Sequence, residues 1–365
     1  MREETIRILF IGPHRPQRNP SQRFRMEQYF PYLTQQGFIC DYSWFISEND
    51  DEVFYSRGKV LSKFMLLLKA FKVRISDLMR INNYDIIFIQ REAFMTGSVF
   101  FEKQFARSHP KLIYDFDDAI WLHETSEGNE SFGWLKRPAK AVNIIRLADL
   151  VITGNNYLAD FARQFNDHIT IIPTVVDTNV FKPADTSKAE GTPICIGWTG
   201  SISTIKHFRL LLSVFRKLKY KYANKICFRL ICDKKTLIEE EWIEKVSWNA
   251  NDEVQQLNQL DIGVMPLPPD EWSKGKCGFK AIQYMSLEIP VVLSPVGVNT
   301  EIVRHGINGF LASSEQDWFK FLSMLIDSKE LRIKIGEAAR KTIVAKYSLQ
   351  SQLPVLISNL RALTS

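Results

Sequence analysis

The sequence predicts an α/β protein made of two successive doubly wound domains. Short apolar runs alternate with longer segments of helical period along most of the 365 residues. Runs that are apolar on both faces, with helices between them, are typical of a parallel sheet covered by helices on each side. One polar, turn-rich stretch near the middle interrupts the series of strands. The length is comfortable for two domains of this kind.

The first series of strands begins close to the N-terminus. The run Ile6–Ile11 ends in Gly12, and a segment of helical period follows it and closes at Gly37. Four further strands are predicted, with helices between most of them, at Asp85–Ile89, Lys111–Asp115, Asp149–Thr153 and Ile169–Ile172.

The second series begins with a strand at Pro193–Gly197. Apolar residues spaced for one helix face then predict a strong amphipathic helix from Ile205 to Leu218. The chain ends in helical segments at about Asp317–Lys346 and Gln350–Leu363. Between these helices, further strands are predicted at Lys225–Cys232, Asp261–Leu267 and Pro290–Ser294.

The stretch Lys182–Pro193, KPADTSKAEGTP, is short and rich in turn-forming residues, as domain boundaries are. Two doubly wound domains of similar size imply a cleft between them, with ligands bound beyond the carboxyl ends of the strands. We therefore expect a first domain at 1–183, a linker at 184–192, a second domain at 193–346 and a C-terminal helix at 347–365.

Composition indicates a soluble globular protein, with 45% hydrophobic and 24% charged residues. The 47 basic and 41 acidic residues give a net charge of +6, a mild surplus that suits an anionic substrate or a membrane surface. The N-terminal sequence has the pattern of neither a signal peptide nor a transmembrane span, so a cytoplasmic location is expected.

The five cysteines are odd in number and scattered through the sequence. Cys40, Cys195 and Cys227 lie in apolar, strand-like runs, which favours buried free thiols over a disulfide framework. No cysteine has a His or Cys partner at zinc-binding spacing.

The most informative segment is Asp261–Ala312. It contains MPL at Met265–Leu267, YMSLEIPVV at Tyr284–Val292, EIV at Glu301–Val303 and NGF at Asn308–Phe310. These pieces, in this order and with these gaps, resemble the donor-binding half of retaining GT-B glycosyltransferases of family 4. The resemblance implies two Rossmann-like domains that face a central cleft, with the C-terminal helices packed back on the first domain. It also implies that Glu301 contacts the donor.

Two glutamates of that family are absent. In the family's Glu-x7-Glu pattern they would stand at Gly275 and Gln283, and the sequence instead resembles a subgroup with a basic loop, KGKCGFK, before the helix. A loop that runs into a helix N-terminus offers N–H groups and a positive dipole end to an anion. We expect Lys274, Lys276 and Lys280 to add charge where a donor pyrophosphate would lie. The donor-binding candidates here are Lys276, Gly278, Phe279, Lys280 and Gln283, and the alternative is a solvated lysine cluster that caps a helix.

A second donor-side segment, GWTGSISTIKHF, follows the first strand of the second domain. The resembled family often has an Arg at the position of Ser201 and a Lys at that of Lys206, a pair that clamps the diphosphate. Gly200 permits close approach of the backbone to a ligand, and Gly12 ends the first strand of the first domain in a similar way. We expect Gly12, Gly200, Ser201 and Lys206 to bind the donor; the alternative for Lys206 is a plain first-turn lysine.

The segment YDFDDAIWLHE follows the strand at Lys111–Asp115. Aspartates at a strand end are costly unless they are solvated, paired or metal-bound. The resembled family often has a His here that faces the sugar, and needs no metal ion, so no metal site is expected. Asp117, Asp118 and His123 are the candidate catalytic residues. The alternative is that Asp118 caps a helix, with the charges in water.

Arginines also follow two strands of the first domain. The loop Gly12–Tyr29 carries four of them, and QRE at Gln90–Glu92 carries Arg91. Because guanidinium groups suit phosphate, we take Arg23 and Arg91 as acceptor-side candidates. The other arginines of the loop are expected to be ordinary surface charges.

The segment Arg57–Ile81 combines an apolar helical run with several Lys and Arg residues. Basic amphipathic helices can lie on anionic membranes, which would place the protein peripherally on the inner membrane surface. Leu61, Phe64, Met65 and Leu68 also fit a helix that faces the core, and the pattern favours this second interpretation.

The resemblance implies a glycosyltransferase that moves a sugar from a nucleotide-diphosphate donor, with UDP- or GDP-sugars expected, to a glycan or lipid-linked acceptor. Transfer with retention, in cell-surface polysaccharide synthesis, is the expected role. No tightly bound cofactor and no nucleic-acid partner are expected. The alternatives are a catalytically degenerate GT-B module that binds a glycan or a partner, and a GT-B nucleotide-sugar epimerase. The sequence disfavours a Rossmann dehydrogenase, because no GxGxxG follows the first strand and no acid on a second strand is evident.

Overall fold

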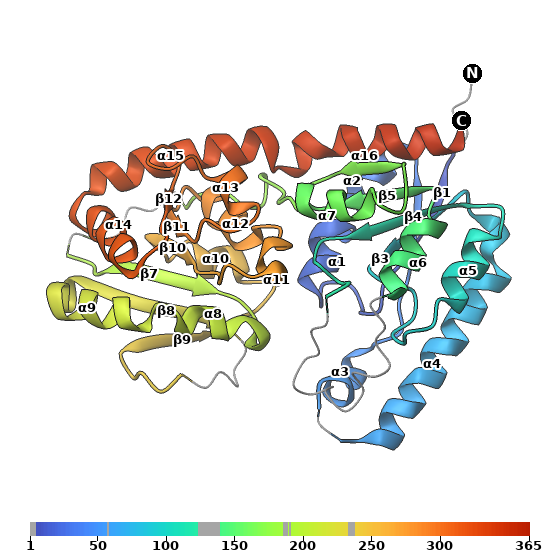
Figure 1. The fold of residues 1–365 in the computed structure, drawn as a ribbon, viewed down its shortest axis with the longest axis horizontal. Helices are drawn as coiled ribbons and strands as arrows, with labels where there is room; N and C mark the ends of the chain where they lie inside the picture. Colours follow the sequence, from blue (N-terminus) through green and yellow to red (C-terminus); the bar gives the residue numbers. More distant parts are fainter. Residues whose placement is uncertain (1–4, 57, 123–138, 185–188, 190, 233–237) are drawn as a thin grey trace. The chain divides into compact units, whose positions relative to one another are not determined.

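The computed structural model describes residues 5–56, 58–122, 139–184, 189, 191–232 and 238–365 (Figure 1). The chain divides into two compact units. Unit 1 comprises Met1–Thr174 together with Gln352–Ser365, and unit 2 comprises Val175–Ser351.

Unit 1 is built on a sheet of six parallel strands in the order β2-β1-β3-β4-β5-β6. The central strands are apolar on both faces and fully buried, as expected when helices cover both sides of a sheet. The register pairs Ile8 with Ile86 and Ile113 with Leu150. The strands are β1 (Arg7–Ile11), β2 (Ile39–Ser43), β3 (Ile86–Gln90), β4 (Lys111–Phe116), β5 (Leu150–Thr153) and β6 (Ile169–Ile171).

The helices of unit 1 follow the strands in alternation. The C-terminal helix also contributes to this unit, as the resemblance implied. Its Asn359 accepts a hydrogen bond from Thr170 at 2.9 Å, and its Arg361 lies over the ring of Phe38. The helices are α1 (Pro20–Arg25), α2 (Phe30–Gln35), α3 (Glu48–Tyr55), α4 (Val60–Met79), α5 (Phe100–Ala106), α6 (Ala139–Leu147), α7 (Asn156–Ala162) and the greater part of α16 (Leu349–Thr364).

The prediction that the apolar run of α4 faces the core was wrong. Its four marker residues are exposed, at 76% for Leu61, 54% for Phe64, 58% for Met65 and 41% for Leu68. The opposite side of the helix is the buried one, because Leu66 and Ala70 pack there against Phe45. A helix with apolar residues on two sides leaves the choice of inner face to tertiary packing.

Unit 2 has a second sheet of six parallel strands in the order β12-β11-β10-β7-β8-β9. Its core is formed by the side chains that β7, β8 and β10 direct toward the helices, with Trp198 and Phe228 among the most deeply buried. The strands are β7 (Ile194–Thr199), β8 (Ile226–Cys232), β9 (Ile243–Ser247), β10 (Ile262–Met265), β11 (Val291–Leu293) and β12 (Phe310–Leu311).

The amphipathic helix expected from Ile205 to Leu218 is in fact two helices. The chain tightens between them, where Leu210 and Leu211 donate backbone hydrogen bonds to His207 and Phe208. This turn keeps Phe208, Leu211 and Phe215 buried together, so the apolar period survives the break. The helices of unit 2 are α8 (Ile205–Arg209), α9 (Leu212–Tyr222), α10 (Glu253–Leu257), α11 (Glu271–Lys274), α12 (Phe279–Ser286), α13 (Asn299–Ile302), α14 (Glu315–Asp327) and α15 (Lys329–Lys346).

All five cysteines are free thiols, as predicted. Cys195, Cys232 and Cys277 are buried, but the predicted burial of Cys40 and Cys227 was wrong, because these positions on β2 and β8 are partly exposed. No helix within the described residues is long and apolar enough to cross a membrane.

Candidate functional site

At the carboxyl ends of β3 and β4 in unit 1, Arg91 is paired with Asp117. The Nε and Nη2 atoms of Arg91 donate to the same carboxylate oxygen at 3.0 and 2.9 Å. Arg91 has a φ of 63°, a left-handed conformation that is costly for a residue with a side chain. Such strain is found mostly where the surroundings hold a residue in a functional arrangement.

Asp117 has a second partner from α1. The hydroxyl of Ser21 lies 2.6 Å from Oδ1 of Asp117, and it accepts a hydrogen bond from the amide of Gln90 at 2.7 Å. Burial alone would raise the pKa of Asp117, but Arg91, Arg25 and the Ser21 hydroxyl outweigh it, so the pKa lies below its ordinary value. The carboxylate is thus held ionised at neutral pH.

Asp118 lies beside this pair. Its Oδ2 is 3.6 Å from Nη2 of Arg91, and its Oδ1 accepts from the N–H of Ala119 at 3.3 Å. The alternative of aspartate charges in water does not hold, because the side chains of Asp117 and Asp118 are only 11% and 13% exposed. His123 lies outside the described residues.

The prediction that most arginines of the loop after β1 are ordinary surface charges was wrong, because they are paired within unit 1. Arg25 is buried and pairs with Asp115 through Nε at 3.1 Å, and its Nη1 donates to the carbonyl of Ile172. Arg15 and Arg18 both contact Asp51. These groups are already engaged within unit 1, which holds α1 and the β1 loop in place.

Of the two remaining unit 1 candidates, Arg23 donates to the side chain of Gln17 at 3.2 Å and lies over the ring of Phe24. Gly12 is closely packed: a Cβ there would come within 2.9 Å of the Tyr42 hydroxyl and 3.0 Å of Gln22. The glycine therefore gives room to neighbouring side chains of its own unit.

In unit 2, the charges of three lysines from two distant segments act on His207, and the charge of Asp270 opposes them. Burial and, in decreasing order, the charges of Lys280, Lys206 and Lys276 lower the pKa of His207 to about 4. The ammonium of Lys280 lies 5.2 Å from the ring centre of Trp198. The fold therefore brings the two predicted basic segments to one place, and His207 stays neutral at physiological pH.

The basic loop enters α12 through Gly278. This residue occupies the N-cap with a φ of 65° and has no side chain to cap the first N–H groups of the helix. A Cβ on Gly278 would come within 2.4 Å of Ile302. Phe279, half-buried, begins the helix. Lys274, by contrast, pairs with Glu271 at 2.5 Å on α11.

In the segment after β7, the glycine that was predicted to let a ligand approach the backbone is packed against the protein itself. At Gly200 a Cβ would come within 2.2 Å of the ring of Trp198, so the glycine accommodates an indole of its own chain. Ser201 is exposed and forms a capping arrangement with Thr204 ahead of α8. Lys206 is exposed on the first turn of α8.

Gln283 is buried on α12 and is engaged inside the protein. Its amide donates to Glu253 at 3.0 Å, and the same carboxylate oxygen accepts from the indole N–H of Trp248 at 3.1 Å. A carboxylate therefore lies next to the position where the resembled family has its second glutamate. Glu301 is exposed on α13.

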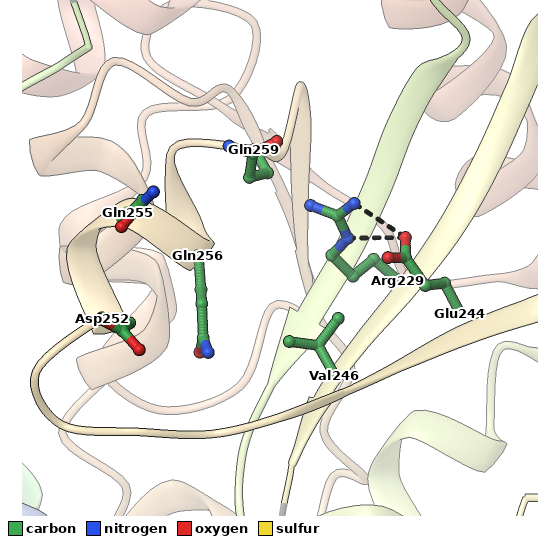
Figure 2. A pocket seen from close by; sticks show the side chains of 7 residues that line it. All are labelled: Arg229, Glu244, Val246, Asp252, Gln255, Gln256 and Gln259. Carbon is green, nitrogen blue, oxygen red and sulfur yellow. Dashed lines mark hydrogen bonds and ion pairs between the residues drawn. The ribbon is translucent and has the colours of Figure 1, made fainter.

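A pocket of about 320 Å³ opens elsewhere in unit 2, between α10 and the strands β8 and β9 (Figure 2). Figure 2 shows Arg229 turned toward Glu244, to which it is bonded at 2.8 Å, with Asp252 and Gln256 on the facing helix. None of the residues predicted from the sequence lines this pocket. Arg229 is the one basic residue among the described residues that line this pocket, and its charge is offset by Glu244. The lysine group is therefore the better candidate for an anion-binding site.

Among the described residues, no group of three or more His, Cys, Asp or Glu side chains is arranged to hold a metal ion. Asp115 at the end of β4 is instead engaged by Arg25, and Asp117 after it by Arg91 and Ser21.

Comparison with known proteins identifies the fold. The structure is similar to sucrose-phosphate synthase from Thermosynechococcus elongatus, with a TM-score of 0.74 at 14% identity over 98% of this chain and 99% of that one. A glycosyltransferase from Rickettsia africae gives 0.69 at 14% identity over 99% of both chains. Anabaena HepE, solved with UDP-glucose, gives 0.68 at 15% identity over 98% and 100%. The fold is GT-B.

Sequence comparison adds a family match for unit 2 of this GT-B chain. Residues 193–328 match the family of glycosyl transferases group 1. A protein of Thermosipho melanesiensis described as a probable sucrose-phosphate synthase is 24% identical over 207 residues, 53% of this chain. That match covers 48% of the relative, so the chain spans about half its length.

Several residues beside Asp117 in unit 1 and beside the lysines in unit 2 were not predicted as site residues from the sequence. Ser21 and Gln90 complete the surroundings of Asp117, and His207 is the residue on which the charges of the lysine group act. His207 directly follows Lys206 in the sequence, and that adjacency was the available signal. Nothing in the sequence pointed to Glu253, because an acidic residue in the first turn of a helix is common.

Proposed function

We propose that this protein is a glycosyltransferase that moves a sugar from a nucleotide-diphosphate donor to a glycan or lipid-linked acceptor. The observation that carries the proposal is that the basic loop and α12 lie against the end of β7, since the ammonium of Lys280 is 5.2 Å from the ring centre of Trp198. The charges of Lys206, Lys276 and Lys280 all act on His207, within a segment that matches glycosyl transferases group 1. Transfer with retention, and a role in polysaccharide synthesis, rest on the family 4 resemblance of the sequence.

The chemistry requires stabilisation of a leaving diphosphate. The bond from the anomeric carbon to a phosphate oxygen breaks, a bond to an acceptor oxygen forms, and the acceptor hydroxyl releases its proton. The nucleoside diphosphate leaves with added negative charge. Lysine ammonium groups and the N-terminus of α12 can stabilise that charge as it develops. We assign diphosphate binding to Lys206, Lys276, Lys280 and the backbone at Gly278 and Phe279.

Asp117, with its partners Arg91 and Ser21, is the group in unit 1 that we assign to the sugar or the acceptor. An ionised carboxylate held by a guanidinium and a hydroxyl can accept hydrogen bonds from sugar hydroxyls without moving. Asp118 and Arg23 belong to the same acceptor-side assignment. In unit 2, Gln283 and Glu253 are buried and hydrogen-bonded to each other, so we assign them a positioning role within α12 and α10 and not a direct contact with the ribose.

The test begins with donor binding. UDP, GDP, ADP, dTDP and CMP and their sugar conjugates are added to the purified protein, and the unfolding temperature is measured. UDP-sugars come first, because HepE was solved with UDP-glucose. One nucleotide diphosphate should raise the midpoint, and both Lys206→Ala and Lys280→Ala should weaken its binding about tenfold, since each removes one charge-assisted contact.

Lys217→Ala is the matched control. Lys217 is an exposed lysine on α9 that pairs with Glu315, so its loss changes the net charge equally without touching the lysine group. Equal weakening by all three variants would contradict a specific phosphate site. A well-folded wild type that binds none of the nucleotides would refute the proposed donor class. Acceptor-dependent release of the nucleoside diphosphate then tests the transfer itself.

A further inference from the structure

The long helix α4 presents an apolar face to solvent. Figure 1 shows α4 on the outside of unit 1, beside α5. More exposed large hydrophobic residues lie on it than on any other helix of the described residues. They are Val60, Leu61, Phe64, Met65, Leu68, Phe71 and Met79.

These residues share one side of the helix. At 3.6 residues per turn, Leu61, Phe64, Met65 and Leu68 fall within one stripe, and Met79 lies in line with Leu61. Phe71 extends the stripe toward α5 through Phe101, whose ring centre is 5.4 Å away. Contiguous exposed apolar surface of this kind marks an interaction site more often than scattered apolar residues do.

The helix cannot turn this stripe inward, because its other side is already committed. There, buried Arg74 donates to the carbonyls of Gly12 and Ala93 at 3.0 and 2.6 Å and to Asp77 at 2.7 Å. Rotation of α4 would leave these buried groups unpaired, at a cost much larger than the gain from covering the stripe. The outward direction of the stripe is therefore a stable property of unit 1.

The charges along α4 complement an anionic surface. Lys72 is exposed and lies one turn beyond Leu68 on the stripe itself, whereas the exposed Lys69 is paired with Asp50 of neighbouring α3. Asp77 is the only acid in α4, and it is buried between Arg74 and Arg80. The acids of neighbouring α3 are partly offset, since Asp50 pairs with Lys69 and Glu52 with Lys59.

We propose that the outer face of α4 binds the surface of a bilayer that contains anionic phospholipid. An in-plane helix with an apolar face and lysines beside it has the geometry of an interfacial helix. Its apolar side chains would enter the headgroup region, while the lysine stems reach along them to the phosphates. This inference is independent of the proposed transfer activity, because no residue of the stripe belongs to the candidate site.

The experiment is vesicle flotation with the full chain. Vesicles of phosphatidylcholine alone, and of phosphatidylcholine mixed with phosphatidylglycerol, are compared at low and high salt. Wild-type protein should float with the mixed vesicles, and less at high salt, because lysine attraction to anionic headgroups is screened. The double variant Phe64→Ser/Leu68→Ser should weaken binding at least about tenfold, since it removes two inserting side chains.

Two variants separate the apolar and the charged contributions from general effects. Ile333→Ser/Val344→Ser removes two exposed apolar residues from α15, and it should leave binding unchanged. Lys72→Glu should lower binding to the mixed vesicles about fivefold or more. The serine and glutamate substitutions are all at exposed positions, so unchanged unfolding temperatures will show that the fold is intact.

Three outcomes would overturn the proposal. The first is no binding of wild-type protein to either vesicle. The second is equal binding of wild type and the Phe64→Ser/Leu68→Ser variant. The third is self-association in sedimentation equilibrium that this variant abolishes, without vesicle binding, which would assign the face to a second copy of the chain instead.

Discussion

Arg91 pairs with Asp117 from a left-handed backbone conformation. Its guanidinium donates twice to Oδ1 of Asp117, while its φ is 63° and its N–H donates to the carbonyl of Asp115 at 2.8 Å. The strained backbone conformation of Arg91 thus accompanies its ion pair with Asp117. The turn directs the side chain back onto the strand end that carries the aspartates.

Substitution of Arg91 separates the backbone strain from the ion pair. Both Arg91→Ala and Arg91→Gly remove the partner of a largely buried carboxylate, so each should lower the free energy of unfolding by about 1–3 kcal/mol. Glycine adopts the left-handed conformation without strain, so Arg91→Gly should remain more stable than Arg91→Ala by about 1 kcal/mol. Urea denaturation of the three proteins measures both differences. Equal stability of the two variants would show that the backbone there is unstrained.

Arg74 should be among the residues of unit 1 most sensitive to substitution. It is fully buried and joins α4 to the end of β2 at Ser43 and to the segments after β1 and β3 at Gly12 and Ala93. Arg74→Met would leave two carbonyls and part of Asp77 unpaired, with an expected loss of about 3–5 kcal/mol in unfolding free energy. Arg80→Met, at a partly exposed arginine on the same Asp77, should cost less than about 1 kcal/mol. Similar losses for both would contradict this account.

The strands that the sequence predicted are the inner strands of both sheets and one apolar edge strand, β6. β3 and β4 are apolar on both faces and gave uninterrupted runs. β2, with sequence ICDYS, and β9, with sequence IEKVS, were missed. Both are edge strands of their sheets, and polar residues interrupt their apolar runs. β12, at two residues, is too short to leave a pattern.

For the candidate sites, sequence reasoning found strand ends but not the partners of the residues there. Asp117 and Arg91 were each singled out, yet their pairing depends on the order of β3 and β4 in the sheet. The grouping of Lys206 with Lys280 likewise depends on β7 lying beside β10. The wrong prediction of which face of α4 is buried has the same cause. The buried face is set by the hydrogen bonds of Arg74 to Gly12 and Ala93, which are distant in the sequence.

Gly278 should be sensitive both as a left-handed residue and as a site of close packing. Gly278→Ala would strain a φ of 65° and place a Cβ within 2.4 Å of Ile302, with an expected loss of about 2–4 kcal/mol. Gly306→Ala is the matched control, because its φ is 75° but nothing lies within 4 Å, and it should cost only about 1–2 kcal/mol. Thermal unfolding measures the difference. Gly278→Ala should also weaken binding of inorganic pyrophosphate, whereas Gly306→Ala should not.

The titration of His207 reports on the lysine group. Burial and the three lysines lower its pKa from 6.5 to about 4, so the folded protein loses stability from this group as the pH falls from about 6.5 toward about 4. Lys280 is the strongest of the three charges, so Lys280→Ala should raise the pKa of His207 more than Lys206→Ala does. Bound pyrophosphate should raise it as well, because it neutralises the same charges.

The measurement is an NMR titration of the histidine ring signals between pH 3.5 and 7.5, a range chosen to span both pKa values. The sequence contains six histidines, and the signal absent from His207→Gln identifies the one that matters. A midpoint that moves upward in Lys280→Ala and with pyrophosphate places both the lysine and the anion beside His207. If the midpoint moves in Lys280→Ala but not with pyrophosphate, the lysine lies beside His207 but pyrophosphate does not bind there. That result would transfer the search for the donor phosphate to another part of unit 2.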